Sequence, residues 1–137
     1  MNGVDSQLNV EYYINIMDTF GDMLRRCRRE SGLSQRELAK RVGVDFSYIS
    51  KLENGRLPAP AAETILRLTE VMGTSAEELL AAAKKMPTGI NERLAEKPAA
   101  LRFLQEATQM GLSEEEWVQL RESLHELRLP FDKDRMP

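Results

Sequence analysis

Residues 35–52, QRELAKRVGVDFSYISKL, decide the fold of this chain. They predict two helices joined by a tight turn. The small Ala39 lets the helices approach closely, and Gly43 supplies a backbone conformation with positive φ that a residue with a Cβ adopts only at a cost. Ile49 is expected to point back into the angle between the helices, where neighbouring leucine and valine side chains cover it.

The second helix of this pair keeps a free outer face, which carries Phe46, Ser47, Ser50 and Lys51. A helix held out from a small body, with short polar and cationic side chains on its free face, suits the DNA major groove. Lysine can donate to guanine O6 or N7, phenylalanine can lie on a thymine methyl, and serine can bond several bases. These four residues are the predicted base-reading set.

The longer stretch LSQRELAKRVGVDFSYISKLENGRLPAP, residues 33–60, resembles the helix-turn-helix of the lambda-repressor-like (Xre/Cro) family. LSQ before the first helix, alanine, glycine and isoleucine at that spacing, and ENG after the second helix carry the likeness, which extends over about residues 19–83. An ordinary antiparallel helix pair would explain Ala39 and Ile49, but not the flanking LSQ and ENG. The resemblance implies an all-α fold, in which a five-helix DNA-binding domain precedes a small helical C-terminal region.

The resemblance also implies contacts to the DNA backbone. Ser34 and Gln35 would bind phosphate at the start of the first helix, where helix N-termini attract anions. Asn54 and Arg56 should clamp the sugar-phosphate backbone after the second helix, and Tyr48 either touches phosphate or covers the edge of the core. The second helix lacks the glutamines of well-known phage repressors, so only the positions carry over and the operator sequence does not follow.

A basic cluster precedes the motif at residues 25–29. The simplest interpretation is a solvated face, and the resemblance offers another. In the family, an arginine at the place of Arg28 pairs with the glutamate of ENG, here Glu53, and also faces a phosphate. Such an ion pair would orient the helices more than it would stabilise them, because desolvation offsets much of the attraction.

Capping signals mark most helix starts. A serine with a glutamate three residues later can form a capping box, as in Ser34–Glu37, Ser75–Glu78 and Ser113–Glu116. Asp45 is a good cap for the helix over 45–53, and Ala61 is a poor one for the helix over 61–72. Residues 19–31 and 99–110 are also predicted helices, each ended by a glycine.

Composition divides the chain into five parts. We predict an N-terminal extension (1–18), a helix-turn-helix DNA-binding domain (19–83) and a linker, KKMPTG (84–89). A helical C-terminal region (90–130) and a loose tail (131–137) follow. The extension either docks through its apolar stretch VEYYINIM or is not translated, if synthesis begins at Met17.

The C-terminal region is too short to bury a good core alone. Its apolar side chains fall in stripes. In the helix over 99–110 the residues expected to be buried are Leu101, Phe103, Leu104, Ala107 and Met110. The following helix carries a stripe of Trp117, Leu120, Leu124 and Leu127. We expect dimerisation here, which the resemblance supports because family members bind near-palindromic operators as dimers. The alternative is a passive helical cap.

Charge is distributed unevenly along the chain. The net charge of −3 argues at first against a nucleic-acid partner, but residues 19–60 carry +4 while residues 61–137 carry −4. Positive charge is thus confined to the segment with the motif, as a DNA-binding face requires.

Catalytic and metal-binding patterns were not found in the sequence. The single cysteine, Cys27, excludes an intrachain disulfide and is expected in the core, a redox-sensor role being the alternative. The lone His125 has no cysteine or carboxylate cluster at metal-ligand spacing. We therefore expect no enzyme, no cofactor and no metal. With no membrane span and no signal peptide expected, we place the protein in the cytoplasm, associated with the nucleoid.

Three functions fit these observations. The first is a sequence-specific regulator of transcription, a repressor that binds double-stranded DNA as a homodimer. The second is an antitoxin-like DNA-binding protein whose acidic tail, residues 90–130, binds a protein partner. The third is an interaction module that has lost DNA binding.

Overall fold

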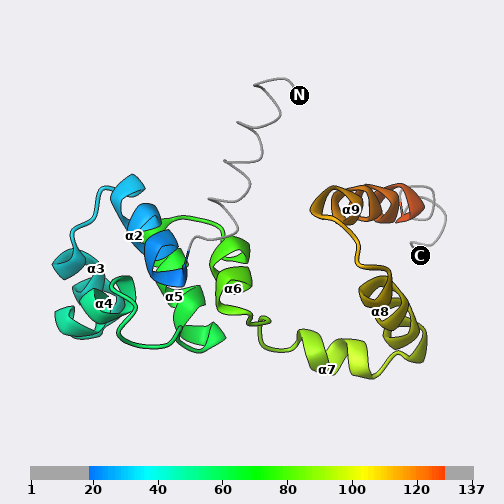
Figure 1. Cartoon of the computed structure of the whole chain (residues 1–137), viewed down its shortest axis with the longest axis horizontal. Helices are drawn as coiled ribbons and strands as arrows, with labels where there is room; N and C mark the ends of the chain where they lie inside the picture. Colours follow the sequence, from blue (N-terminus) through cyan, green and yellow to red (C-terminus); the bar gives the residue numbers. More distant parts are fainter. Residues whose placement is uncertain (1–18, 129–137) are drawn as a thin grey trace, which may run out of the picture. The chain divides into compact units, whose positions relative to one another are not determined.

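The computed structural model describes residues 19–128, and this part of the chain is all helical, as predicted (Figure 1). The predictions for residues 1–18, 129–130 and 131–137 lie outside the described residues. The helices are α2 (Phe20–Glu30), α3 (Gln35–Val42), α4 (Phe46–Glu53), α5 (Ala62–Met72), α6 (Glu77–Ala83), α7 (Ile90–Ala95), α8 (Pro98–Met110) and α9 (Glu114–Arg128). They form two compact units that divide after Ile90.

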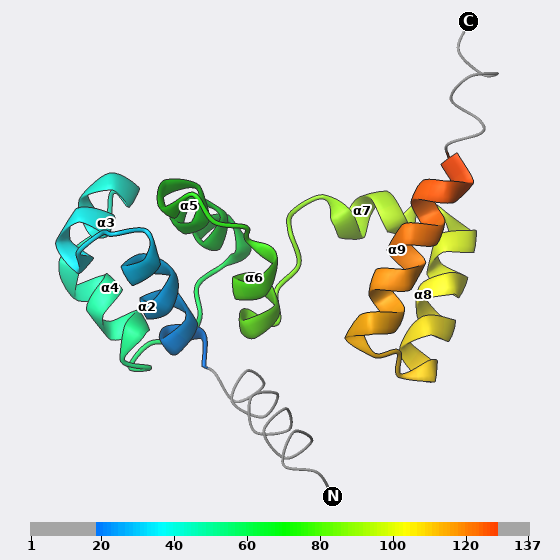
Figure 2. The same cartoon turned by 90° about the horizontal axis from the view of Figure 1, so that it is seen from above.

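The core of the first unit is made by five helices, α2 to α6, which Figures 1 and 2 show gathered together. Each of them supplies at least one fully buried aliphatic side chain, from the set Leu24, Leu38, Ile49, Leu52, Ile65, Leu68 and Leu79. Burying one such side chain contributes about 1.5–3 kcal/mol. Cys27 of α2 is buried in this core, as predicted.

Local hydrogen bonds and glycines fix the helix ends, and the capping box predicted for Ser34 and Glu37 is confirmed. The hydroxyl of Thr19 accepts from the N–H of Asp22 at the start of α2. Ser34 and Glu37 form a complete capping box at the start of α3. Gly73 ends α5 in the left-handed conformation, with φ at 69°.

One predicted cap is confirmed in position only, and one predicted capping box is wrong. Asp45 occupies the position before α4, but its side chain makes no capping hydrogen bond. Ser75 and Glu78 form no capping box, since α6 begins at Glu77 and Ala76 holds the capping position. The helix therefore begins one residue later than the Ser75 cap requires, and the Ser75 hydroxyl is out of register with its first free N–H groups.

The second unit contains most of α7 and all of α8 and α9. Pro98 opens α8, and a capping box between Ser113 and Glu116 opens α9, as predicted. The expected interior of α8 is wrong, because only Ala107 is buried. Phe103 is 48% exposed and Met110 is 73% exposed, so these side chains lack cover within the unit.

None of the helices within residues 19–128 is long and apolar enough to cross a membrane.

Candidate nucleic-acid interface

The helix pair takes the predicted geometry. Gly43 follows α3 with φ at 85°, and its N–H and that of Val44 both donate to the carbonyl oxygen of Ala39, each at 2.9 Å. Ala39 is buried, and Ile49 is fully buried at the contact of α4 with the core. The turn therefore sets the angle at which α4 leaves the body of the domain.

The outward face of α4 carries the predicted base-reading set. Ser47 and Lys51 are exposed, and Phe46 is 39% exposed, while Ser50 is half-buried. The amide of Asn54 donates to the Ser50 hydroxyl at 3.4 Å. The opposite face of the same helix is buried through Ile49, Leu52 and Glu53.

A contact that the sequence did not reveal lies at the start of α4. The guanidinium of Arg36, on α3, stands over the ring of Phe46 with its central carbon 4.5 Å from the ring centroid. Arg36 carries no sequence signal for this contact, because the approach of the two side chains depends on the angle between the helices.

Glu53 connects α4 to two other helices. Its carboxylate accepts from Arg28 Nε at 2.7 Å, from Arg28 Nη2 at 3.0 Å and from Gln35 Nε2 at 3.1 Å. Arg25 Nε lies 3.5 Å from the same carboxylate. Burial raises the pKa of Glu53, but the hydrogen bonds from Arg28 and Gln35 and the charges of Arg28 and Arg25 outweigh it and hold the pKa below its ordinary value.

The two arginines bind more than this carboxylate. Arg28 is buried and also donates to the carbonyl oxygen of Leu33 at 2.9 Å. Arg25 donates to the carbonyl oxygen of Glu53 at 3.2 Å and to Oδ1 of Asn54 at 2.9 Å. Arg25 thus satisfies a carbonyl oxygen at the C-terminal end of α4, a group that a helix leaves without a partner. The role of Arg25 was missed, since its register on α2 alone is that of a surface residue.

The predicted phosphate contacts fall into two groups. The first group is exposed and consists of Ser34, Asn54 and Arg56, of which Asn54 accepts a hydrogen bond from Arg25. Gln35 is half-buried and bonded to Glu53. Together with Arg28 and Tyr48, they remain predicted contacts. Tyr48 packs against the hydrophobic core from a half-buried position, which is the second of its two expected placements.

Gly21 permits the close approach of α2 to the end of α4. A Cβ at this position would stand 2.6 Å from the carbonyl oxygens of both Leu52 and Glu53. These are backbone atoms, so they cannot move aside as the end of a side chain could. This contact was not predicted, because nothing in the sequence shows which backbone atoms lie opposite Gly21.

The comparisons with known proteins agree with this geometry. The family described as "Helix-turn-helix domain" matches residues 19–82. The uncharacterized HTH-type transcriptional regulator y4dJ of Sinorhizobium fredii is 38% identical over 69 residues, which cover 50% of this chain and 88% of that protein.

Two proteins of Bacillus subtilis are also similar. The uncharacterized HTH-type transcriptional regulator RghRB is 40% identical over 67 residues, or 49% of this chain and 48% of that protein. The HTH-type transcriptional repressor RghR is 38% identical over 64 residues, or 47% of each chain. The chain thus spans about half the length of both. A solved structure of the biofilm regulator SinR in complex with DNA is 31% identical and covers 45% of this chain and 98% of that one, with a TM-score of 0.43.

The helix pair with its exposed second helix defines a helix-turn-helix DNA-binding protein. The chain belongs to the family of HTH-type transcriptional regulators, since its match covers nearly nine-tenths of the Sinorhizobium regulator. The resemblance to lambda-repressor-like proteins is confirmed, and the three relatives described above are named as regulators of transcription.

Proposed function

We propose that the protein binds a specific double-stranded DNA sequence by placing α4 in the major groove, as a homodimer that represses transcription. The observation that carries the proposal is the division of α4 into two faces. Ile49 and Leu52 are buried in the core, while Ser47 and Lys51 on the other face are exposed. Lys51 is assigned to a guanine edge, and Phe46, Ser47 and Ser50 to the neighbouring bases.

The phosphate contacts form the second part of the proposal. Ser34 and Gln35 lie at the start of α3, whose free N–H groups favour an anion. Asn54 and Arg56 follow α4, and the N–H of Arg56 is already bonded to the carbonyl oxygen of Lys51, which fixes this turn. Contacts on both sides of α4 would set its register in the groove without reading sequence.

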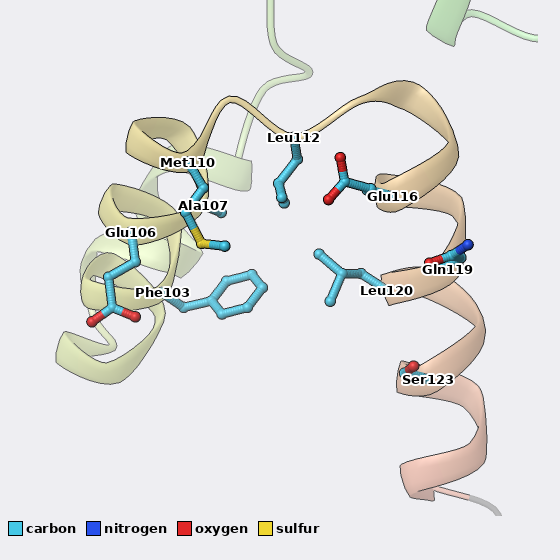
Figure 3. Close-up of a pocket in the computed structure, with 9 residues that line it drawn as sticks. All are labelled: Phe103, Glu106, Ala107, Met110, Leu112, Glu116, Gln119, Leu120 and Ser123. Carbon is cyan, nitrogen blue, oxygen red and sulfur yellow. The ribbon is translucent and has the colours of Figure 1, made fainter.

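The homodimer is proposed to form through residues 90–130. Figure 3 shows Phe103 and Met110 of α8 and Leu120 of α9 pointing into the space between the two helices. These side chains and their neighbours line a cavity of about 310 Å³, and Leu124 and Leu127 further along α9 are 59% and 64% exposed. Apolar surface of this kind, left without cover in one copy, is typical of a protein interface. The alternative is a passive helical cap, which involves no second copy.

Repression and the place of action are further parts of the proposal. The relative RghR is named a repressor, and its matched region includes this helix pair. A dimer would place two α4 helices in successive major grooves about 34 Å apart, on a near-palindromic operator. Bound at a promoter in the cytoplasm, it would exclude polymerase.

Selection of bound sequences from random double-stranded DNA tests this function. The expected winners contain two related half-sites whose centres lie one helical turn, about 10 base pairs, apart or a multiple of it. Winners with a single half-site would contradict the homodimer, and no enrichment would contradict sequence-specific binding.

The antitoxin-like alternative uses the same exposed apolar surface for a different occupant. It predicts a monomer that co-purifies with the product of a neighbouring gene when the two are expressed together. Sedimentation of the protein expressed alone distinguishes the two hypotheses. The homodimer gives twice the mass of one chain without any other protein, whereas the antitoxin-like alternative gives the mass of a monomer.

A further inference from the structure

The contact between Arg36 and Phe46 lies on the outward side of the helix pair. Arg36 is exposed, and within residues 19–128 no hydrogen bond or ion pair engages its guanidinium, whose contact is the face of the Phe46 ring. Phe46 in turn is the first residue of α4 and keeps 39% of its surface exposed. Both side chains are therefore available to a ligand that approaches α4.

Stacking on a ring fixes the plane of a guanidinium while leaving its edge free. The ring attracts the cation that stands over its face, and a guanidinium that lies flat on a ring keeps all five N–H donors at its free edge, because they lie in its plane. Arg36 is thus restrained before any ligand binds, and less side-chain freedom is lost when it donates. A fork of donors with a fixed orientation is what an in-plane pair of acceptors requires.

The position of the pair indicates which acceptors these are. The N-terminal residues of a recognition helix are the ones that meet base edges, and the ring of Phe46 belongs to that end of α4. A phosphate accepts donors from many directions and needs no fixed plane, whereas guanine presents O6 and N7 side by side in the plane of its base pair.

We propose that Arg36 is a specificity-determining residue that reads a guanine through O6 and N7, and that Phe46 is the residue that positions it. This inference rests on the proposed function, in which α4 enters the major groove. The guanidinium carbon and the ring centroid are only 4.5 Å apart, so the two side chains can reach adjacent base pairs but not distant ones. The guanine therefore lies next to the base pair that Phe46 contacts.

Base selection with the full chain and its variants tests the proposal. The variants are Arg36→Ala, Arg36→Lys, Phe46→Leu and the double variant Phe46→Leu with Arg36→Ala. Arg41→Ala is the matched control, because Arg41 is an exposed cation of the same helix without a ring contact in the described residues. Affinities are then measured on single-base variants of the selected operator at several salt concentrations.

Arg36→Ala is expected to remove a guanine preference of roughly 5- to 150-fold at one position of each half-site. Arg36→Lys should keep the overall affinity better than it keeps this preference, since lysine lacks the planar fork. Phe46→Leu should weaken the same guanine preference although Arg36 is intact, and the double variant should lose no more of it than Arg36→Ala does. Arg41→Ala should leave the preference unchanged.

Several results would overturn the assignment. Equal weakening on all sequences by Arg36→Ala, with a reduced salt dependence, would identify Arg36 as a phosphate contact. If Arg36→Ala lost the guanine preference at no position of the half-site, the proposal would also be rejected, while the proposed function would remain intact. A wild-type protein that selects no motif would reject both. Urea unfolding of each variant verifies that the exposed substitutions leave the fold in place.

Discussion

The carboxylate of Glu53 illustrates how one residue positions the recognition helix. It is buried at the end of α4 and accepts from side chains of α2 and α3, so three helices meet at one negative charge. A buried ion pair adds little net stability compared with apolar packing, but removing one partner leaves the other charge without compensation. Orientation of α4 is thus the main contribution of this group.

Stability should depend on pH through this residue. The folded-state pKa of Glu53 lies below its ordinary value of about 4.3, so the unfolded chain binds more protons in the window below that value. The free energy of unfolding is therefore expected to fall as the pH falls through this window. Glu53→Gln should cost about 3–5 kcal/mol at neutral pH, because Arg28 stays buried without its counter-charge.

Urea unfolding at a series of pH values measures this. The difference in free energy of unfolding between wild type and Glu53→Gln should shrink towards acid, where the wild-type carboxylate is protonated as well. Two profiles that run parallel from neutral pH to pH 3 would contradict the assigned titration.

Gly21→Ala tests the close approach of α2 to α4 through the sign of its effect. In an open helix this change would stabilise by about 0.5–1 kcal/mol, since alanine is the better helix former. Against the carbonyl oxygens of Leu52 and Glu53 it should instead destabilise by about 1–3 kcal/mol. The midpoint of thermal or urea unfolding gives the sign, and an increase would contradict the packing.

The roles of two residues in DNA binding can be separated by affinity. Lys51→Ala should weaken operator binding by about 1–3 kcal/mol and relax the preference at one base pair, because it removes a base contact. Gln35→Ala should weaken operator and random DNA about equally. Titration of both variants on operator and random duplexes checks this, and equal losses on the two DNAs for both variants would reject the assigned roles.

Local chemistry explains which of these residues could be predicted. The turn at Gly43 and the pairing of Arg28 with Glu53 were predicted because spacing or resemblance pointed to them. Gly21, Arg25 and Arg36 were missed as interacting residues. Each acts on a partner that is distant in sequence, and the sequence does not contain the angle between the helices.

At the scale of elements, capping chemistry was predicted better than burial. The capping boxes of α3 and α9 form as expected, since they depend on residues within one turn. The box at Ser75 does not form, since α6 begins only at Glu77 and Ala76 holds the capping position. The apolar stripe of α8 predicts a face that packs against something, but most of its residues are exposed in this structure. A stripe does not identify the partner that covers it.

The exposed apolar residues of α8 and α9 give a prediction at this scale. Phe103→Glu and Leu124→Glu should convert a dimer into monomers, because a charge at a packed interface has no partner there. Leu66→Glu is the matched control, since Leu66 is an exposed leucine of the first unit, on α5. Sedimentation equilibrium measures the mass, and an unchanged mass for both variants would place the interface elsewhere.

At the scale of the whole molecule, the charge of the chain is divided between its parts. Residues 19–60 carry +4, whereas the chain as a whole carries −3. Overall charge therefore opposes contact with DNA, and only the segment around the helix pair favours it. The negative charge of the rest of the chain should therefore disfavour DNA binding through any surface other than the helix pair.

Operator affinity should fall steeply with salt as a result. Each phosphate neutralised by the protein releases counterions, and the logarithm of the association constant falls by about 0.9 per phosphate for each unit in the logarithm of salt concentration. Arg56→Ala should lower this slope by about 1. Binding that barely changes between 50 and 200 mM salt would favour an interaction module without DNA binding.

The division of α4 into a buried face and an exposed face also bears on how such regulators diverge. Side chains that hold the helix in place, such as Ile49 and Leu52, are separate from those that meet DNA, such as Ser47 and Lys51. Exchanges on the exposed face cost little folding free energy. A duplicated gene can therefore acquire a new target site in few mutational steps, each of which leaves a protein that still folds.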